Sequence, residues 1–498
     1  MLDQRSCGIL LHPSSLPGQG GIGSLGADAR RFIDLLQAMG MRYWQVLPLS
    51  PPACSNSPYS AFSAFAGNPL LIDLEQLIAA GDLTPSDKQG SFPEDRVDFG
   101  AVIEQKSRLL RQAAVTFLQQ PTTERTQEFR RFCAVTFWLQ DYTLFMALKQ
   151  RYGGAVWSCW SGEAACPTPE VKERLMRECS EEIAVQSYLQ WQLFRQWHGL
   201  RCYANQRGIA VIGDIPIFVA YDSADVWSRR ELFLLDDKGT PQVVAGVPPD
   251  YFSATGQLWG NPLYDWQRME QEGYSWWVDR FRCLFEQFDL VRVDHFRGFE
   301  AAWNIPANAT TAVDGVWVTG PGERLFDALQ SALGRLPIIA EDLGVITPEV
   351  LALRDRYGFP GMKILQFGFD AELDDRDLPH NHVRHGVVYT GTHDNDTSNG
   401  WYTARSEAER NAMHAYLGTV PGNGADDLIR AALMSVADTV IIPLQDILGL
   451  GSEARMNIPG TTFGNWEWRF CWEMLPSDLA ASVRNRLKQY ERLCQEDA

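Results

Sequence analysis

The chain has 498 residues, which exceeds one ordinary compact core unless a single large barrel carries insertions. Its 62 acidic side chains outnumber the 44 basic ones, and the resulting net charge of −18 argues against nucleic acid or an anionic membrane as a partner. No apolar run approaches the length of a membrane span.

The cysteines and the first residues indicate the compartment. Ten cysteines are scattered from Cys7 to Cys494 without a Cys-x-x-Cys pair. The first six residues lack the basic and then apolar pattern of a secretory signal. We therefore expect reduced thiols and a cytoplasmic protein.

Short apolar runs alternate with helical patterns along the chain. The first two runs flank a helical pattern over 32–39, which Gly40 ends as a C-cap. Eight such runs are predicted strands, centred near residues 8, 44, 211, 291, 338, 364, 388 and 441. Eight strands with helices between most of them predict the α/β class and a (β/α)₈, or TIM, barrel.

Two segments interrupt this alternation. Residues 70–205 contain long amphipathic stretches without convincing strands, which predicts a largely helical insertion after the second strand. Residues 220–270 form a second insertion at the active-site face, and the Gly and Pro content of 248–262 favours an irregular loop. About fifty residues follow the last strand, too few for a C-terminal β-sandwich of roughly 100 residues. We expect one catalytic barrel over 1–498.

Several of the predicted strands end in acids. Asp214, Glu341 and Asp394 close or directly follow three of these runs, and Asp294 closes a fourth. One such acid is as readily explained by a salt bridge at a strand end. Because the carboxyl ends of barrel strands meet at one face, the recurrence favours a shared site.

The pair Asp294 and Glu341 suits glycosidic chemistry. Retaining cleavage needs two carboxyl groups about 5–5.5 Å apart, and neighbouring strands lie about 4.7–4.9 Å apart. An inverting pair would need about 6.5–9.5 Å, which suits strands further apart. Arg292 points to the same side as Asp294 and should favour its ionised form, whereas the apolar residues before Glu341 should favour its protonated form. Asp342 should point to the opposite face and support the barrel.

The motifs around these acids resemble known ones. Arg-Val-Asp294-His-Phe-Arg-Gly, Ala-Glu341-Asp-Leu-Gly and Gly-Thr-His-Asp394-Asn-Asp resemble the strand-end motifs of the α-amylase superfamily, most closely its 4-α-glucanotransferase (amylomaltase) branch. The resemblance implies that Asp294 is the nucleophile and Glu341 the acid/base. It implies that Asp394 holds sugar hydroxyls and stabilises the transition state.

The resemblance to this branch extends to a lid-like loop over 246–262. Core packing is the alternative for each of its aromatic side chains and for Phe367. The implied substrate-binding residues are Tyr59, Asp214, Asp250, Tyr251, Phe252, Trp259, Arg292, Phe367, Asp370 and His393.

The function implied is transfer of α-1,4-glucan segments by a retaining double displacement. Donors would be malto-oligosaccharides, amylose or glycogen-derived glucans, and acceptors glucose or maltose. Two carboxylates need no cofactor, and the spacing of His380, His382 and His385 fits a solvated loop better than a metal site. The alternatives are an α-1,4-glucan hydrolase using water and a catalytically inactive glucan-binding protein, against which the intact acids argue.

Overall fold

The computed structural model describes residues 4–53, 55–87, 91–120, 122–249, 253–370, 375–422 and 424–493. Three of the predicted substrate-binding residues, Asp250, Tyr251 and Phe252, lie outside these ranges.

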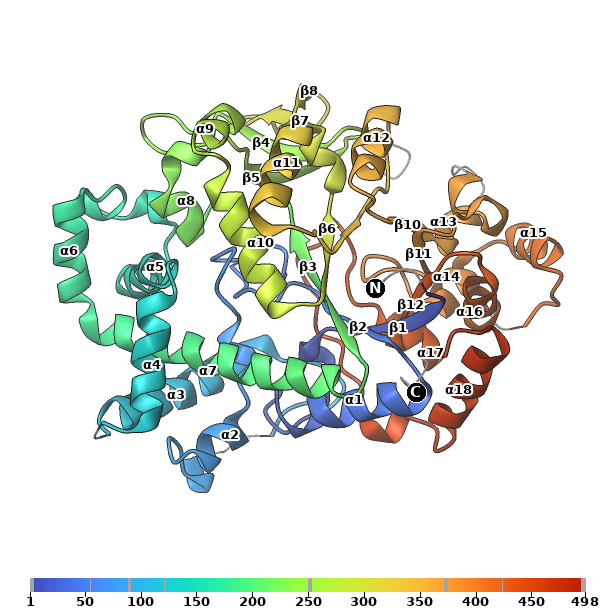
Figure 1. Cartoon of the computed structure of the whole chain (residues 1–498), viewed down its shortest axis with the longest axis horizontal. Helices are drawn as coiled ribbons and strands as arrows, with labels where there is room; N and C mark the ends of the chain where they lie inside the picture. The colour runs from blue at the N-terminus through green and yellow to red at the C-terminus, as the bar shows by residue number, and fades with distance from the viewer. Residues whose placement is uncertain are drawn as a thin grey trace.

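Eight parallel strands close into a barrel in the order β1-β12-β11-β10-β9-β6-β3-β2 (Figure 1). Their bounds are β1 (Ser6–Leu10), β2 (Tyr43–Gln45), β3 (Ala210–Pro216), β6 (Leu290–Asp294), β9 (Ile338–Ala340), β10 (Gly361–Ile364), β11 (Gly386–Tyr389) and β12 (Thr439–Pro443). Each of the eight predicted strands is confirmed. They could be recognised because strands buried on both faces are nearly continuous apolar runs.

Helices cover the outside of the barrel. Those between or after its strands are α1 (Ala27–Met39), α7 (Ser180–Asn205), α8 (Ala224–Ser228), α9 (Trp266–Gln271), α10 (Ser275–Gln287), α11 (Glu323–Leu333), α12 (Pro348–Arg356), α13 (Leu365–Gly368), α14 (Ser398–Ala404), α15 (Glu407–Leu417), α16 (Gly424–Met434), α17 (Leu444–Ile447) and α18 (Leu479–Gln489). Helix α1 ends at Gly40, whose φ of 78° is the left-handed conformation that glycine adopts readily.

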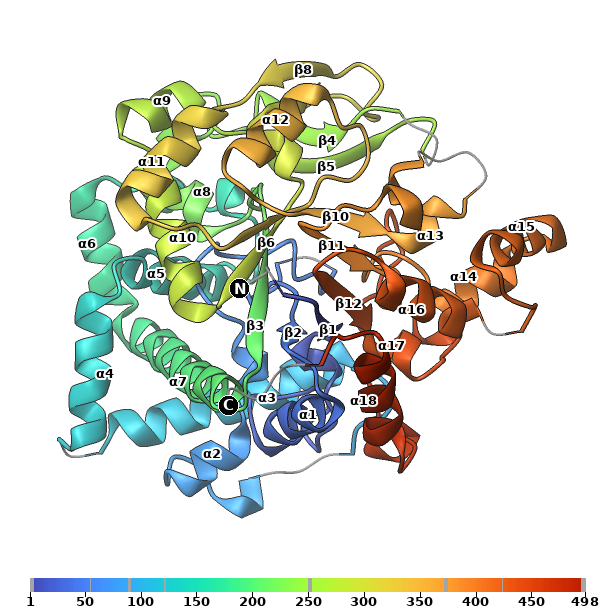
Figure 2. The same ribbon diagram turned by 45° about the vertical axis from the view of Figure 1, so that its right-hand side comes forward.

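The segment between β2 and β3 is helical over most of its length. It contains α2 (Leu74–Ala79), α3 (Phe99–Leu118), α4 (Glu124–Val135), α5 (Leu139–Arg151) and α6 (Pro169–Glu178) before α7. Helices α3, α4 and α5 pack against α7, and α7 packs against β3. Figures 1 and 2 show this group as a lobe on the α7 side of the barrel.

A second sheet lies where an irregular loop was predicted. It has the order β5-β4-β7-β8, formed by β4 (Val243–Val247), β5 (Gln257–Pro262), β7 (Ala301–Pro306) and β8 (Val316–Thr319). The prediction of a purely irregular segment over 248–262 was therefore wrong. Pairing with β4 supplies the backbone hydrogen bonds that composition could not reveal, and a Cβ on Gly246 would lie 2.1 Å from the Gln257 carbonyl oxygen.

The part of the chain after β12 is short and irregular or helical. Among its described residues, Leu444–Leu493, there are no named strands, so there is no C-terminal sandwich in that part. Helix α18 packs against α1 and so closes the barrel's outer layer. Across the described ranges, no helix is both long enough and apolar enough to cross a membrane.

Candidate active site

The two acids of the predicted pair lie at the ends of adjacent strands. Val293 of β6 pairs with Ala340 of β9, so Asp294 and Glu341 come next on the two strands. The Glu341 amide donates to the Val293 carbonyl over 3.0 Å. The predicted adjacency of these strands is confirmed, while the carboxyl separation of about 5–5.5 Å stays a prediction.

Arg292 joins two acids beneath the mouth of the barrel. Its Nη2 lies 2.9 Å from Asp294 Oδ1, and its Nη1 lies 2.8 Å from Asp214 Oδ2 on the neighbouring strand. Asp214 also accepts a hydrogen bond from the Tyr59 hydroxyl over 2.6 Å. Arg292 and Asp214 are buried. Because a buried charge is costly unless paired, this cluster fixes the position of Asp294 through its partners.

Glu341 is buried in the apolar end of β9 and held by backbone donors. Its Oε2 accepts from the His295 amide over 2.6 Å and its Oε1 from the Leu343 amide over 2.8 Å. Burial, followed by the negative charge of Asp294, raises the pKa of Glu341 to about 7, although Arg292 and the two amides oppose the shift. At neutral pH the carboxyl can therefore both give and take a proton.

Asp294 is in a mixed environment. Burial raises its pKa, and the Arg292 guanidinium acts in the opposite direction, as predicted. The sequence led us to expect only the effect of Arg292, so the net upward direction is a correction. The reason is desolvation of a carboxylate at the mouth of a packed barrel, which a neighbouring arginine does not fully offset here.

A stack of rings forms the wall beside Asp394. Tyr59 and His393 stack with centroids 5.0 Å apart and planes 12° apart, and Trp466 lies 5.9 Å from each. His393 Nε2 is 3.5 Å from Asp394 Oδ1. Glu341 follows β9 directly, whereas Asp394 lies on a loop five residues beyond β11, and its side chain is 49% exposed.

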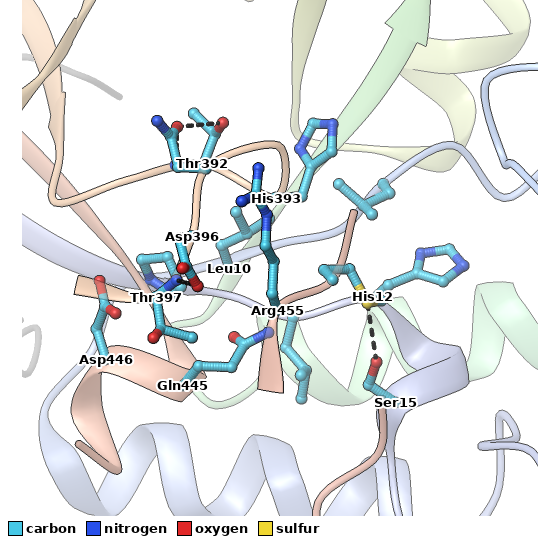
Figure 3. A pocket seen from close by; sticks show the side chains of 15 residues that line it. Leu10, His12, Ser15, Thr392, His393, Asp396, Thr397, Gln445, Asp446 and Arg455 are labelled. Carbon is cyan, nitrogen blue, oxygen red and sulfur yellow. Dashed lines mark hydrogen bonds between the residues drawn. The ribbon is translucent and has the colours of Figure 1, made fainter. Parts of the chain in front are cut away.

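A small pocket adjoins this wall, between the ends of β1, β11 and β12 (Figure 3). Its lining includes His12, His393, Gln445 and Arg455, and Figure 3 shows the Arg455 side chain between Gln445 and the Thr392–His393 segment. Burial and the nearby His393 lower the pKa of His12 to about 3, so its ring is neutral at physiological pH.

The other predicted residues lie around this centre. Trp259, on β5, is 39% exposed and meets the His295 ring edge to face at 4.9 Å. Phe367, in α13, is partly buried against the main core. Asp370 forms an ion pair with Arg405, and among the described residues it makes no contact with Asp294, Glu341 or Asp394.

The three histidines of the 380–385 segment have separate partners. His380 contacts the Tyr416 hydroxyl, His382 is buried against Ser435, and His385 bonds the Gly358 carbonyl. A solvated loop was predicted, and the burial of His382 contradicts this for that residue. Within the described ranges, no group of three or more His, Cys, Asp or Glu side chains could hold a metal ion.

Sequence reasoning missed two residues of the site. Asn457 Nδ2 donates to Asp394 Oδ1 over 2.6 Å, and Arg455 Nη2 donates to the Asp394 carbonyl over 2.7 Å. Both come from a segment after β12 with no strand pattern. The sequence feature nearest to them that matches the family is the Asn-Trp-Glu-Trp-Arg run at 465–469.

Comparison with known proteins gives a consistent result. A family model described as 4-alpha-glucanotransferase matches residues 11–474. The chain is 49% identical over 502 residues to a 4-alpha-glucanotransferase of Thermus thermophilus, covering 98% of this chain and 99% of that one. It is 50% identical over 499 residues to one of Synechocystis sp., covering 99% of each. An amylomaltase from Streptococcus agalactiae, solved in complex with acarbose, superposes with a TM-score of 0.95 at 37% identity, covering 99% of this chain and 100% of that one.

Proposed function

The chain belongs to the 4-alpha-glucanotransferase family and is a transferase of that kind, and from this premise we propose that Asp294, Glu341 and Asp394 carry out its chemistry. Asp294 is the nucleophile, Glu341 is the general acid and base, and Asp394 stabilises the transition state. The observation that carries the proposal is the contrast between two neighbouring acids. Asp294 is partly exposed and forms an ion pair with Arg292, whereas Glu341 is buried, held by backbone amides, and has its pKa raised to about 7.

In the first half of the reaction, the donor glucan is cleaved. Protonated Glu341 gives its proton to the glycosidic oxygen while an Asp294 oxygen attacks the anomeric carbon. The bond to the leaving sugar breaks with its electron pair on that oxygen, and a glycosyl ester forms on Asp294. The buried Arg292 holds the attacking carboxylate in place through its 2.9 Å contact.

In the second half, the ester passes the sugar to an acceptor. Glu341, now ionised, takes the proton of the acceptor's 4-hydroxyl, whose oxygen attacks the anomeric carbon and releases Asp294. Two inversions restore the α-1,4 linkage. Adjacent strands β6 and β9 support this retaining course, because an inverting enzyme needs room for a water between its carboxyl groups.

The remaining predicted contacts complete the proposal. Tyr59 and His393 flank the sugar that reacts, and the buried pair Arg292 and Asp214 supports it from beneath. Trp259 borders the acceptor side. Asp250, Tyr251 and Phe252, which lie outside the described residues, and Phe367 and Asp370 are assigned to glucan binding by the resemblance of their motifs alone. The 39% exposure of the Trp259 side chain, and its contact with His295 next to Asp294, support this role for Trp259.

For the substrates, the proposal names malto-oligosaccharides, amylose and glycogen-derived glucans as donors, with glucose or maltose as acceptors. The two carboxylates supply acid, base and nucleophile, so the reaction needs no organic cofactor. The net charge of −18 disfavours nucleic acid as a partner and suits a neutral glucan. A cytoplasmic location agrees with ten cysteines that lack a Cys-x-x-Cys pair.

Incubation with maltotriose tests the transfer reaction. Transfer gives glucose together with maltopentaose and longer oligomers, whereas hydrolysis gives only shorter sugars. A product series without longer oligomers would contradict the proposed course. The role of Asp294 is tested separately by trapping the ester with a fluoride donor in a Glu341→Gln variant, where a sugar bound to any other residue would contradict the assignment.

A further inference from the structure

Asp394 is held by a part of the chain other than the barrel. It follows β11 on an exposed loop, and its carboxylate accepts a 2.6 Å hydrogen bond from Asn457 Nδ2. Arg455 Nη2 donates to its main-chain carbonyl over 2.7 Å. Among the described residues, the side chains that contact the carboxylate do so at Oδ1: Asn457, and His393 at 3.5 Å. Oδ2 is thus the oxygen available to sugar hydroxyls.

The segment that carries Asn457 is itself closed and fixed. We call residues 455–466 the terminal loop. At its base the Trp466 amide donates to the Met456 carbonyl over 2.7 Å, and Asn465 Oδ1 accepts from the Ile458 amide over 2.9 Å. Arg455 Nε donates to the Asn457 carbonyl over 2.8 Å, so the two residues that contact Asp394 also fix each other.

The other end of the terminal loop also contacts the site. Trp466 is buried with a φ of 66°, a conformation that a bulky residue adopts only where its surroundings impose it. Its ring lies 5.9 Å from both His393 and Tyr59. The loop therefore touches the site at both ends, with Asp394 at one end and the ring stack at the other.

We propose that Asn457 and Arg455 are positioning residues that orient the Asp394 carboxylate for the transition state, an inference that rests on the role proposed for Asp394. A half-exposed carboxylate can rotate about two side-chain bonds, and only one orientation presents Oδ2 to the sugar. The Asn457 amide selects that orientation before substrate arrives, and Arg455 fixes the main chain to which the carboxylate is attached. Electrostatic stabilisation of this kind depends on groups that need no reorganisation during the reaction.

The first test removes the donor. Asn457→Ala should lower kcat on maltotriose on the order of 10²-fold, the scale expected for a misplaced reacting group, with KM changed only a few-fold. The same factor should appear with a maltosyl fluoride donor, because stabilisation by Asp394 does not depend on the leaving group. Arg455→Lys, which retains the charge but not the forked donors, should show a smaller loss of the same kind.

A matched control lies in the same loop. Thr461 Oγ1 donates to the Ile458 carbonyl and accepts from Asn465, without contacting Asp394. Thr461→Ala should leave kcat within a few-fold of the wild type. Equal losses in Thr461→Ala and Asn457→Ala would mean that only general loosening of the loop matters, and would overturn the inference.

A double-mutant cycle tests the coupling directly. If Asn457 acts through Asp394, then Asn457→Ala should have almost no further effect in an Asp394→Asn background, measured with the fluoride donor. Independent, multiplicative losses would overturn the inference. An Asp394→Asn variant with near-normal turnover would instead overturn the role proposed for Asp394 itself, so the two failures are distinguishable.

An isosteric variant covers the case in which Asn457→Ala does not fold. In Asn457→Asp a protonated carboxyl can still donate to Asp394, whereas two ionised carboxylates in contact repel each other. This variant leaves unchanged the other groups that face Asp394, which are His393, Asp294, Tyr59 and Arg455. The kcat of this variant should be lowest at neutral pH and should recover towards the wild type as pH falls. A constant ratio to the wild type across pH would overturn the inference.

Discussion

The barrel holds two of the three acids through its own strands, whereas the third depends on the distant terminal loop. Glu341 accepts bonds from backbone amides next to β6 and β9, and Asp294 is paired with Arg292 two residues earlier on the same strand. Asp394 is paired with Asn457, 63 residues away in the sequence. In the proposed mechanism, the two acids that make and break bonds are thus fixed by strand register, and the acid that stabilises charge is fixed by tertiary contact.

Burial also separates Glu341 from Asp394. Glu341 is 9% exposed, and its carboxyl is deprived of water enough to bring its pKa to about 7. The Asp394 side chain is 49% exposed. A strand end inside a barrel can tune a proton donor by desolvation, while a loop acid remains solvated until substrate covers it. Substitution of Glu341 should therefore change proton transfer, whereas substitution of Asp394 should change the stabilisation of the transition state.

The largest effect is expected for Asp294, the proposed nucleophile. Asp294→Asn keeps the shape of the side chain but cannot form the ester, so kcat should fall on the order of 10⁶-fold, as when other enzymes lose their nucleophile. Turnover of maltotriose and thermal unfolding should be measured on the same preparation. Near-normal turnover in a folded variant would remove Asp294 from the mechanism.

Loss of the acid should depend on the leaving group. Glu341→Gln should slow maltotriose transfer about 10²- to 10⁴-fold, the usual contribution of a general acid or base. Formation of the ester from a fluoride donor should be much less affected, because fluoride departs with little protonation. Asp342→Asn is the matched control, since Asp342 accepts from the Met362 amide and pairs with Arg354 rather than facing Asp294. Equal losses with both donors would contradict the role of Glu341.

The raised pKa of Glu341 also has a consequence for stability. The folded protein keeps this proton up to pH about 7, whereas the unfolded chain loses it near 4.5, so stability should fall as pH rises between these values. The pKa shift corresponds to a loss of about 3 kcal/mol in the free energy of unfolding across this range. Glu341→Gln cannot ionise and should lose less stability between pH 5 and pH 8 than the wild type. The free energy of unfolding should be measured for both proteins at the two pH values. An equal change in the wild type and in Glu341→Gln would contradict the raised pKa.

The sequence predicted the barrel well for a physical reason. Strands such as β9 and β11 are buried along their whole length, so their residues form uninterrupted runs without a charge, and the polar residues that follow such runs mark the mouth. Asp294 and Glu341 were placed at the mouth in this way, and Arg292 was recognised as the charge two residues before Asp294 within β6. The predicted adjacency of β6 and β9 is confirmed, while the catalytic roles stay predictions.

The terminal loop and the second sheet could not be predicted in the same way. Asn457 contacts Asp394 through the path of an irregular segment, and nothing in local periodicity reports such a contact. Strand β5 has three exposed residues at its start and two glycine or proline residues, so its pattern is that of a loop. It becomes a strand by pairing with β4, and β4 in turn pairs with β7, some forty residues beyond β5.

The smallest effect is expected for Trp259, which belongs to this second sheet and not to the barrel. Transfer requires that the acceptor be held while water is kept away from the Asp294 ester. Trp259 is exposed for stacking on a sugar and lies against His295, so Trp259→Ala should raise the ratio of hydrolysis to transfer about 3- to 10-fold, the scale of one aromatic contact. Ester formation from a fluoride donor should be unchanged.

Trp317→Ala is the control, because Trp317 is a similarly exposed tryptophan on β8 of the same sheet and packs against Trp303 and Arg297. Glucose release and chain redistribution from maltotriose should be followed in parallel. If both variants change the ratio equally, the sheet acts as a whole; if neither does, water is excluded by another part of the acceptor side.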